Sequence, residues 1–444
     1  MVSLAYQPHP LKKGIAWSTG DISALEWYPD SITRITPIIT VGDLQYQRIL
    51  GFGAAMTDTS AWLIFHSKQR DQIMKDLFDP KNGLGISLIR LPVGASDFIH
   101  SREPYSYDDL PQGKSDVLLK GFSIAHDKEY IIPLLKKAIV LNPNLQIIAS
   151  PWSPPGWMKT NNSLLGSYNG HVGTLRSEDY SVYAQYLVYF IKAYQQQGIP
   201  IYGLTIQNEP LSPVATYPGM IMSPVQEVRF ISSFLIPALQ KAGLRIKVLL
   251  YDQNWNTQTY VQELLKLSRN YNLNIAWHCY GGNPQLMTTI HTWFPNEEQY
   301  ITECSTGSTG IAPMNAIQLL ISTTQNWAGG VDLWNLALDQ TGGPKIGKGC
   351  GGCTGLLTIY QNKYVLTDNY QELAQFSKFV KPGARRIYSS QEVAGLESVA
   401  FINPDTTHVL IVFSSKSAIH FKVSYHGMSF FYFLPPQKAV TFIW

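Results

Sequence analysis

From about residue 47 to residue 383, short apolar runs alternate with longer segments that carry helical periodicity. Most of the apolar runs are continuous, which is typical of parallel strands buried on both faces. Strand followed by helix, repeated eight times, predicts an α/β fold of the (β/α)₈ barrel type. The eight predicted strands are 48–53, 85–92, 145–152, 202–209, 246–251, 275–279, 300–303 and 331–334.

The segments between these runs carry helix signals. Residues 177–198 space aromatic and aliphatic side chains along one face and stop at Gly198. The run Ser223-Pro224-Val225-Gln226 is a capping box that opens a predicted helix ending at Gly243. Residues 315–327 and 369–380 are predicted to be helical as well. An open doubly wound sheet is less favoured, because no Gly-rich dinucleotide motif follows the first strand.

The pattern changes after residue 383, where short β runs are separated by turns. Residues 15–39 also read as strands. We therefore expect both ends of the chain to build one antiparallel β-sandwich beside the barrel. The predicted parts are 1–46 for the N-terminal sandwich strands, 47–383 for the catalytic barrel and 384–444 for the C-terminal sandwich strands.

The 444 residues are 45% hydrophobic, which is enough for a large core and a second, smaller domain. The net charge of +3 gives no electrostatic reason to expect a nucleic-acid partner. No apolar stretch approaches 18 residues, so no transmembrane segment is predicted, although transient contact with a membrane surface stays open. The 25 Tyr and 11 Trp suit either a sugar site or a large aromatic core.

The segment from Met1 to Lys13 is polar and contains Pro. It lacks the apolar middle of a signal peptide. We expect either no leader or a leader that is absent from this sequence, and the compartment stays open. We also expect a monomer.

Four cysteines are present. Cys350 and Cys353 form a C-x-x-C in a Gly-rich loop, where a local disulfide or two free thiols both fit. Cys279 and Cys304 lie on separate predicted strands and lack the spacing of a zinc site. We therefore expect no metal and no cofactor.

Two carboxylates stand at the ends of apolar strands: Glu209 ends the fourth predicted strand and Glu303 ends the seventh. The C-terminal ends of the strands are where a (β/α)₈ barrel holds its catalytic groups. Sugar hydrolysis through an oxocarbenium-like transition state requires two carboxylates. Two ordinary strand-end Glu residues are the alternative, which the amide pair Gln207-Asn208 beside Glu209 makes less favoured.

Further polar and aromatic residues cluster at the predicted strand ends. An Asn beside a catalytic Glu can hydrogen-bond a sugar 2-hydroxyl, and an Asp can accept from sugar hydroxyls. An Arg on the second strand can orient a carboxylate or form a structural salt bridge. The candidate substrate-binding residues are Asp97, Trp152, Asn208, Tyr217, His278, Tyr280 and Trp334, with Arg90 as a supporting residue.

The chain contains the long motifs GFGAAMTD at 51–58, RLP to SDF at 90–98, SPWSPPGWMKTN at 150–161, QNEP at 207–210, and WNLAL at 334–338 with GGP at 342–344. These motifs resemble glycoside hydrolase family 30, the glucosylceramidase family, and the loop 349–355 looks more like its microbial members. The resemblance implies a retaining mechanism with Glu209 as acid/base and Glu303 as nucleophile. It also implies that Arg90 supports the nucleophile. The residues that it implies hold the terminal glucose are Asp97, Trp152, Asn208, Tyr280 and Trp334.

Cys279 departs from the pattern expected for that family, which also includes β-1,6-glucanases and β-xylosidases. The predicted function is a retaining β-glucosidase that hydrolyses glucosylceramide, a lipid-linked glucoside, to glucose and ceramide. An endo-β-1,6-glucanase is the alternative in the same class, and an inactive glycan-binding barrel is the alternative in another. The lipid prediction depends on apolar loop residues that look exposed, namely Leu164, Leu165, Tyr217, Met220, Ile221, Met222, Ile311 and Met314.

Overall fold

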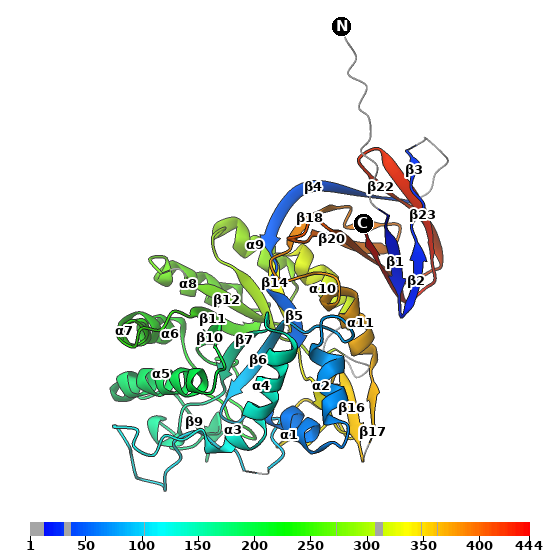
Figure 1. Cartoon of the computed structure of the whole chain (residues 1–444). Helices are drawn as coiled ribbons and strands as arrows, with labels where there is room; N and C mark the ends of the chain where they lie inside the picture. The colour runs from blue at the N-terminus through cyan, green and yellow to red at the C-terminus, as the bar shows by residue number, and fades with distance from the viewer. Residues whose placement is uncertain are drawn as a thin grey trace.

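The computed structural model describes residues 13–30, 37–101, 103–271, 273–306, 314–347, 349–361 and 363–444. Eight parallel strands close into a barrel in the order β10-β11-β12-β13-β14-β5-β6-β7 (Figure 1). This confirms the predicted (β/α)₈ barrel. The strands are β5 Gly51–Ala54, β6 Leu88–Val93, β7 Gln146–Pro151, β10 Gly203–Thr205, β11 Lys247–Asn254, β12 Asn274–His278, β13 Gln299–Glu303 and β14 Ala328–Leu333.

The barrel strands are apolar because both of their faces are covered. Every residue of β6, β12, β13 and β14 is buried. Strand β5 approaches β6 so closely that a Cβ on Gly53 would lie 1.8 Å from the carbonyl oxygen of Leu88. Glycine at that position therefore allows β5 to pair with β6 and close the barrel.

Helices surround the barrel (Figure 1). Helix α5 buries the aromatic face predicted for residues 177–198. The capping box at Ser223 forms, but the predicted helix 223–243 contains a π-turn at 231–235, because Pro237 has no N–H to donate to Ser233. The helices are α1 Asp58–His66, α2 Arg70–Phe78, α3 Ala125–Glu129, α4 Ile131–Leu141, α5 Tyr180–Gln196, α6 Pro224–Phe230, α7 Ile236–Lys241, α8 Gln258–Ser268, α9 Gln285–Trp293, α10 Ala316–Gln325 and α11 Asp368–Ser377.

Strands from both ends of the chain form the second layered unit, as expected for a sandwich built from both termini. Strand β1 pairs with β24, and β4 lies between β18 and β22. Strand β4 is longer than predicted and curves from the sandwich to the barrel (Figure 1). These strands are β1 Ile15–Ser18, β2 Asp21–Ala24, β3 Tyr28–Pro29, β4 Ile38–Arg48, β18 Arg385–Ser389, β19 Glu392–Val393, β20 Leu396–Ile402, β21 His408–Ser414, β22 Ile419–Tyr425, β23 Met428–Leu434 and β24 Lys438–Ile443.

Five short strands form two small sheets outside the barrel, β8-β9 and β15-β16-β17. They are β8 Ser167–Tyr168, β9 His171–Val172, β15 Ala337–Leu338, β16 Leu357–Tyr360 and β17 Lys363–Leu366. The fourth barrel strand is shorter than predicted: β10 ends at Thr205, and Glu209 lies four residues beyond it.

Within the part of the chain that the structure describes, no helix has the length and apolar character to cross a membrane.

Candidate active site

Glu303 is the last residue of β13 and is buried at the barrel mouth. The guanidinium of Arg90, from the middle of β6, forms a hydrogen-bonded ion pair with its Oε2. The hydroxyl of Tyr280 donates to its Oε1 at 2.8 Å. Both oxygens of the carboxylate are therefore held by donors, and the side chain is fixed in one orientation.

Glu209 is positioned by a loop, because its strand has already ended. Its backbone has a φ of +46°, which is rare for a residue other than glycine and recurs at functional sites. The backbone N–H of Asn208 donates to the carbonyl of Pro151 at 2.8 Å, and the N–H of Glu209 donates to that of Asp252 at 3.0 Å. These two bonds tie the loop to β7 and β11.

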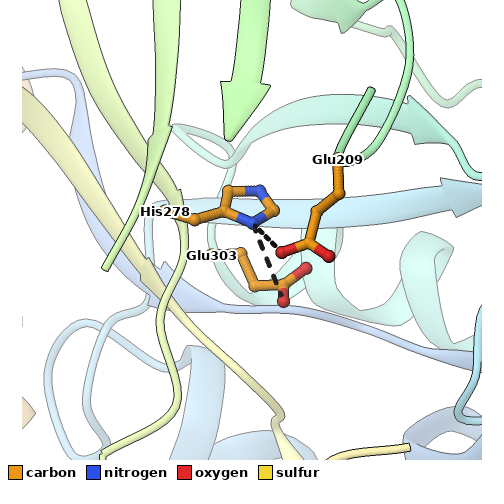
Figure 2. Close-up of side chains that lie close together, drawn as sticks. All are labelled: Glu209, His278 and Glu303. Atoms are coloured by element: carbon orange, nitrogen blue, oxygen red, sulfur yellow. Dashed lines mark hydrogen bonds and ion pairs between the residues drawn. The ribbon is translucent and has the colours of Figure 1, made fainter. Parts of the chain in front are cut away.

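Figure 2 shows Glu209 and Glu303 pointing toward one another beside the His278 ring. One oxygen of Glu209 lies within 4.8 Å of one oxygen of Glu303. Retaining glycosidases hold their two carboxyl groups about 5–5.5 Å apart, and inverting ones about 6.5–9.5 Å. The arrangement in this chain fits a carboxylate that attacks carbon directly better than a pair that leaves room for a water.

Asp252 on β11 is a fully buried hub that the sequence analysis missed. It accepts from Arg90 at 2.6 Å and from the Nε2 of His278 at 3.1 Å. Three hydroxyls also donate to it, from Ser150, Thr205 and Thr302. An available signal was its place directly after the apolar run 246–251, since an acid at that position of a barrel strand faces the mouth.

Asp252 and His278 are both ionised because charged neighbours outweigh the effect of burial. Burial alone would raise the pKa of Asp252, but Arg90 and the hydrogen bonds from His278 and Ser150 hold the pKa well below its usual range. Burial likewise opposes charge on His278, yet Glu303 and the bonds to Asp252 and Glu209 raise its pKa to about 9. His278 is therefore a cation at neutral pH and donates from both ring nitrogens.

Glu303 experiences opposing influences. Burial raises the pKa of its carboxyl above the ordinary Glu value, the cations His278 and Arg90 lower it, and the charge of Glu209 raises it again. The net direction is upward. Ionised Glu303 thus depends on the two cations beside it.

An aromatic wall closes one side of the site. The rings of Trp152 and Trp334 stack with centroids 5.5 Å apart, and Phe98 meets Trp334 edge-on. Tyr217 packs against this cluster and is partly buried. The Arg90 guanidinium lies 4.6 Å from the Trp152 ring, which shields its charge from water.

Asp97 is buried in the loop after β6 and lies beside the two carboxylates. Burial and then the Glu303 charge raise the pKa of Asp97 to about 8. At neutral pH its carboxyl is protonated and can donate, whereas the sequence analysis expected it to accept. A Cβ on Gly349 would come within 2.7 Å of the Asp97 carboxylate, so the β14 loop packs closely against it.

All four cysteines form disulfides, Cys279 with Cys304 and Cys350 with Cys353. The second pair settles the choice between a local disulfide and free thiols, and the first was not foreseen. Among the described residues, one group of His, Cys, Asp and Glu lies close enough to hold a metal ion, namely Glu209, His278 and Glu303. A doubly donating His278 has no lone pair for a metal, and the predicted absence of metal stays a prediction.

The loop residues behind the lipid prediction are more covered than expected. Met220 and Met222 are buried, because they pack the loop onto the barrel. Four are half-buried, namely Leu164, Leu165, Ile221 and Met314, as is Tyr217. Ile311 lies outside the described residues. The prediction that these apolar side chains are exposed at the mouth is therefore wrong for Met220 and Met222.

A parallel barrel with two opposed carboxylates, a buried Arg and an aromatic wall defines a glycoside hydrolase. Residues 49–380 match the glycosyl hydrolase family 30 TIM-barrel domain, and residues 383–442 match the family 30 beta sandwich domain. The chain belongs to glycoside hydrolase family 30 and is a glycosidase.

Three similar proteins cover nearly the whole chain. The endo-1,6-beta-D-glucanase BGN16.3 of Trichoderma harzianum is 36% identical over 89% of this chain and 84% of its own length. Putative glucosylceramidase 4 of Caenorhabditis elegans is 31% identical over 90% of this chain and 80% of its own length. The solved structure of the endo-beta1,6-glucanase BT3312 is 29% identical, with a TM-score of 0.83, and covers 97% of this chain and 99% of that one.

Proposed function

We propose that this chain is a retaining endo-β-1,6-glucanase. The observation that carries the mechanism is the approach of Glu209 and Glu303 to within 4.8 Å. The substrate class is supported by similarity to β-1,6-glucanases, among them one at 36% identity. The proposal replaces glucosylceramide, which the sequence analysis favoured, with the alternative from the same family.

In the first step, Glu303 attacks the anomeric carbon and Glu209 protonates the leaving glycosidic oxygen. The glucosyl group is then covalently bound to Glu303, and the shortened glucan departs. In the second step, Glu209 takes a proton from water, which attacks the same carbon and releases Glu303. Arg90 and Tyr280 stabilise the carboxylate that leaves in this step.

The proposed donor subsite lies between the aromatic wall and the carboxylates. The Asn208 side-chain oxygen accepts from Arg90 at 2.8 Å, which leaves its amide NH₂ to donate to the sugar 2-hydroxyl. The protonated Asp97 donates to another hydroxyl. Trp152 and Trp334 offer ring faces to the sugar, with Tyr217, His278 and Tyr280 at its edges.

Glucosylceramide is the second candidate, because the chain is 31% identical to a protein described as a putative glucosylceramidase. The burial of Met220 and Met222 weakens this candidate. The two long hydrocarbon chains of ceramide need a wide apolar surface at the mouth, and the buried side chains of Met220 and Met222 do not contribute to one.

The test is hydrolysis of a linear β-1,6-glucan and of detergent-dispersed glucosylceramide, side by side. We expect kcat/KM to be higher for the glucan by about tenfold or more, which corresponds to about 1.4 kcal/mol in transition-state binding. NMR of the first products should show the β-anomer. A preference for glucosylceramide would reverse the substrate assignment, and an α-anomer would exclude retention.

The roles of the two carboxylates need a separate test. A 2-deoxy-2-fluoro β-glucoside with a good leaving group should trap a covalent adduct on Glu303, which peptide mass spectrometry can locate. A covalent adduct found on Glu209 instead would mean that Glu209 is the nucleophile and Glu303 the acid/base.

A further inference from the structure

The Cys279–Cys304 disulfide joins the chain segments directly after β12 and β13, beside His278, Tyr280 and Glu303. Cys279 follows His278, the last residue of β12, and precedes Tyr280. Cys304 follows Glu303, the last residue of β13. The cross-link thus lies between Tyr280 and His278 on one side and Glu303 on the other.

The backbone ladder between these strands becomes irregular where the disulfide begins. The pairs Ala276–Tyr300 and Trp277–Ile301 are in register, but His278 pairs with Glu303, so Thr302 is an extra residue. Both strands then end. Cys279 and Cys304 are the next residues, with their Cα atoms 5.3 Å apart and both side chains buried.

The ladder is therefore interrupted by a bulge at Thr302 and ends at the His278–Glu303 pair, directly before the two cysteines. From the proposed role of Glu303 as nucleophile, we infer that the Cys279–Cys304 disulfide is a positioning element that holds Tyr280 and His278 against Glu303. It adds a covalent bond directly beyond the last pair of the ladder. The Tyr280 hydroxyl then keeps its 2.8 Å bond to Glu303, and His278 keeps its cation 4.0 Å from the same oxygen.

The groups that surround Glu303 come from several elements, and the disulfide touches only some of them. Arg90 reaches it from β6 and Glu209 from the loop after β10, and neither element carries a cysteine of this pair. The effect of removing the disulfide should therefore come through the contact between the ends of β12 and β13. The titratable and charged groups facing or near Glu303 are Arg90, Asp97, Glu209, Tyr217, Asp252, His278 and Tyr280.

The test is C279S/C304S in the full chain, with C279V/C304A as a second variant that keeps the packing apolar. Assays on an aryl β-glucoside are run well below the Tm of each variant. We expect kcat to fall by about tenfold, since misplacing a catalytic group by ~1 Å can cost about a hundredfold. KM should change less, and the acid limb of kcat/KM should move to higher pH, because a freed Tyr280 and His278 stabilise the Glu303 carboxylate less.

A double-mutant cycle identifies the route. Y280F should cost less without the disulfide than with it, because the contact is already weakened. Val412→Ala, in the core of the sandwich, is the control for a loss of stability alone, and its acid limb should stay where the parent's is. A lower Tm with unchanged kcat, acid limb and Y280F cost would reduce the Cys279–Cys304 bond to a stabilising link and overturn the inference.

A readout without turnover separates this inference from the proposed function. Carboxyl ¹³C NMR, with Glu303 assigned through E303Q, follows its titration directly in the parent and in C279S/C304S. A parent that hydrolyses no glucoside would count against the proposed function, and the NMR titration would still test the inference. An identical Glu303 titration in the two proteins would refute it.

Discussion

The ends of β10 and β13 present the same chemical group in two different ways. Glu303 is the last residue of strand β13, its side chain is 8% exposed, and Arg90 and Tyr280 occupy its two oxygens. Glu209 lies in a loop beyond its strand, and its side chain is 17% exposed. Within the described part of the chain, the one hydrogen bond to the Glu209 carboxylate comes from His278.

This difference suits two different tasks. A nucleophile must be held in line with the anomeric carbon and kept ionised, which many donors achieve. An acid/base must exchange protons with a leaving group and with water, which needs access and few fixed bonds. His278 contacts both carboxylates. Substitutions at Glu303, at Glu209 and at their neighbours therefore test whether the two carboxylates have these different tasks.

The largest effect is expected from Glu303→Ala. Removing the nucleophile should lower kcat by about 10⁴-fold or more on every glucoside, whatever its leaving group. Initial rates on the glucan and on an aryl β-glucoside measure this, with Glu297→Ala, just before the start of β13, as control. If this variant still hydrolysed the aryl glucoside, Glu303 would be the acid/base and Glu209 the nucleophile.

Glu209→Ala should cost about 10²- to 10⁴-fold on the glucan, as expected for loss of a general acid. An aryl glucoside with a good leaving group needs no protonation, so its glycosylation step should be spared, which pre-steady-state release of the phenol measures. Azide should restore turnover and give a β-glucosyl azide. An α-azide would contradict retention.

Asp97→Ala should weaken a glucose-like inhibitor by roughly ten- to a hundredfold, because a hydroxyl that loses its buried partner costs about 1–3 kcal/mol. Calorimetry measures the Kd. Asp97→Asn is the matched variant, since an amide can still donate, and it should bind better than Ala at pH 7. Unchanged binding in a folded Ala variant would remove Asp97 from the site.

His278→Asn should move the acid limb of kcat/KM to higher pH. The nucleophile must be ionised, so activity is lost as pH falls through the pKa of Glu303. Burial already raises that pKa, and removing the His278 cation removes one of the two charges that lower it. A pH–rate profile on an aryl glucoside measures the limb. A limb that stays in place would mean that Arg90 alone controls Glu303.

The smallest effect is expected from chelation. Activity should survive dialysis against a strong chelator, because the charged His278 has no lone pair to give a metal between the two carboxylates. Activity that disappears and returns with zinc or calcium would show that Glu209, His278 and Glu303 form a metal site.

The sequence was sufficient for the barrel and for both carboxylates. Continuous apolar runs predict doubly buried strands, and Glu303 ends such a run at the position where a barrel holds its catalytic groups. The same pattern placed Glu209 at the mouth, although it misjudged the strand as reaching that residue. The local hydrophobic pattern indicates which side chains are buried, but it does not indicate where the hydrogen bonding between strands ends.

What the sequence by itself determined is the layered architecture, the two acids and the aromatic residues around them, because these follow from periodicity and residue type. Only the tertiary structure decided that Asp252 is the hub of the site, that Asp97 is protonated, that Met220 and Met222 are covered, and that Cys279 joins Cys304 across 25 residues. Each of these depends on which distant residues meet when the barrel closes, since burial and neighbouring charge set protonation and exposure.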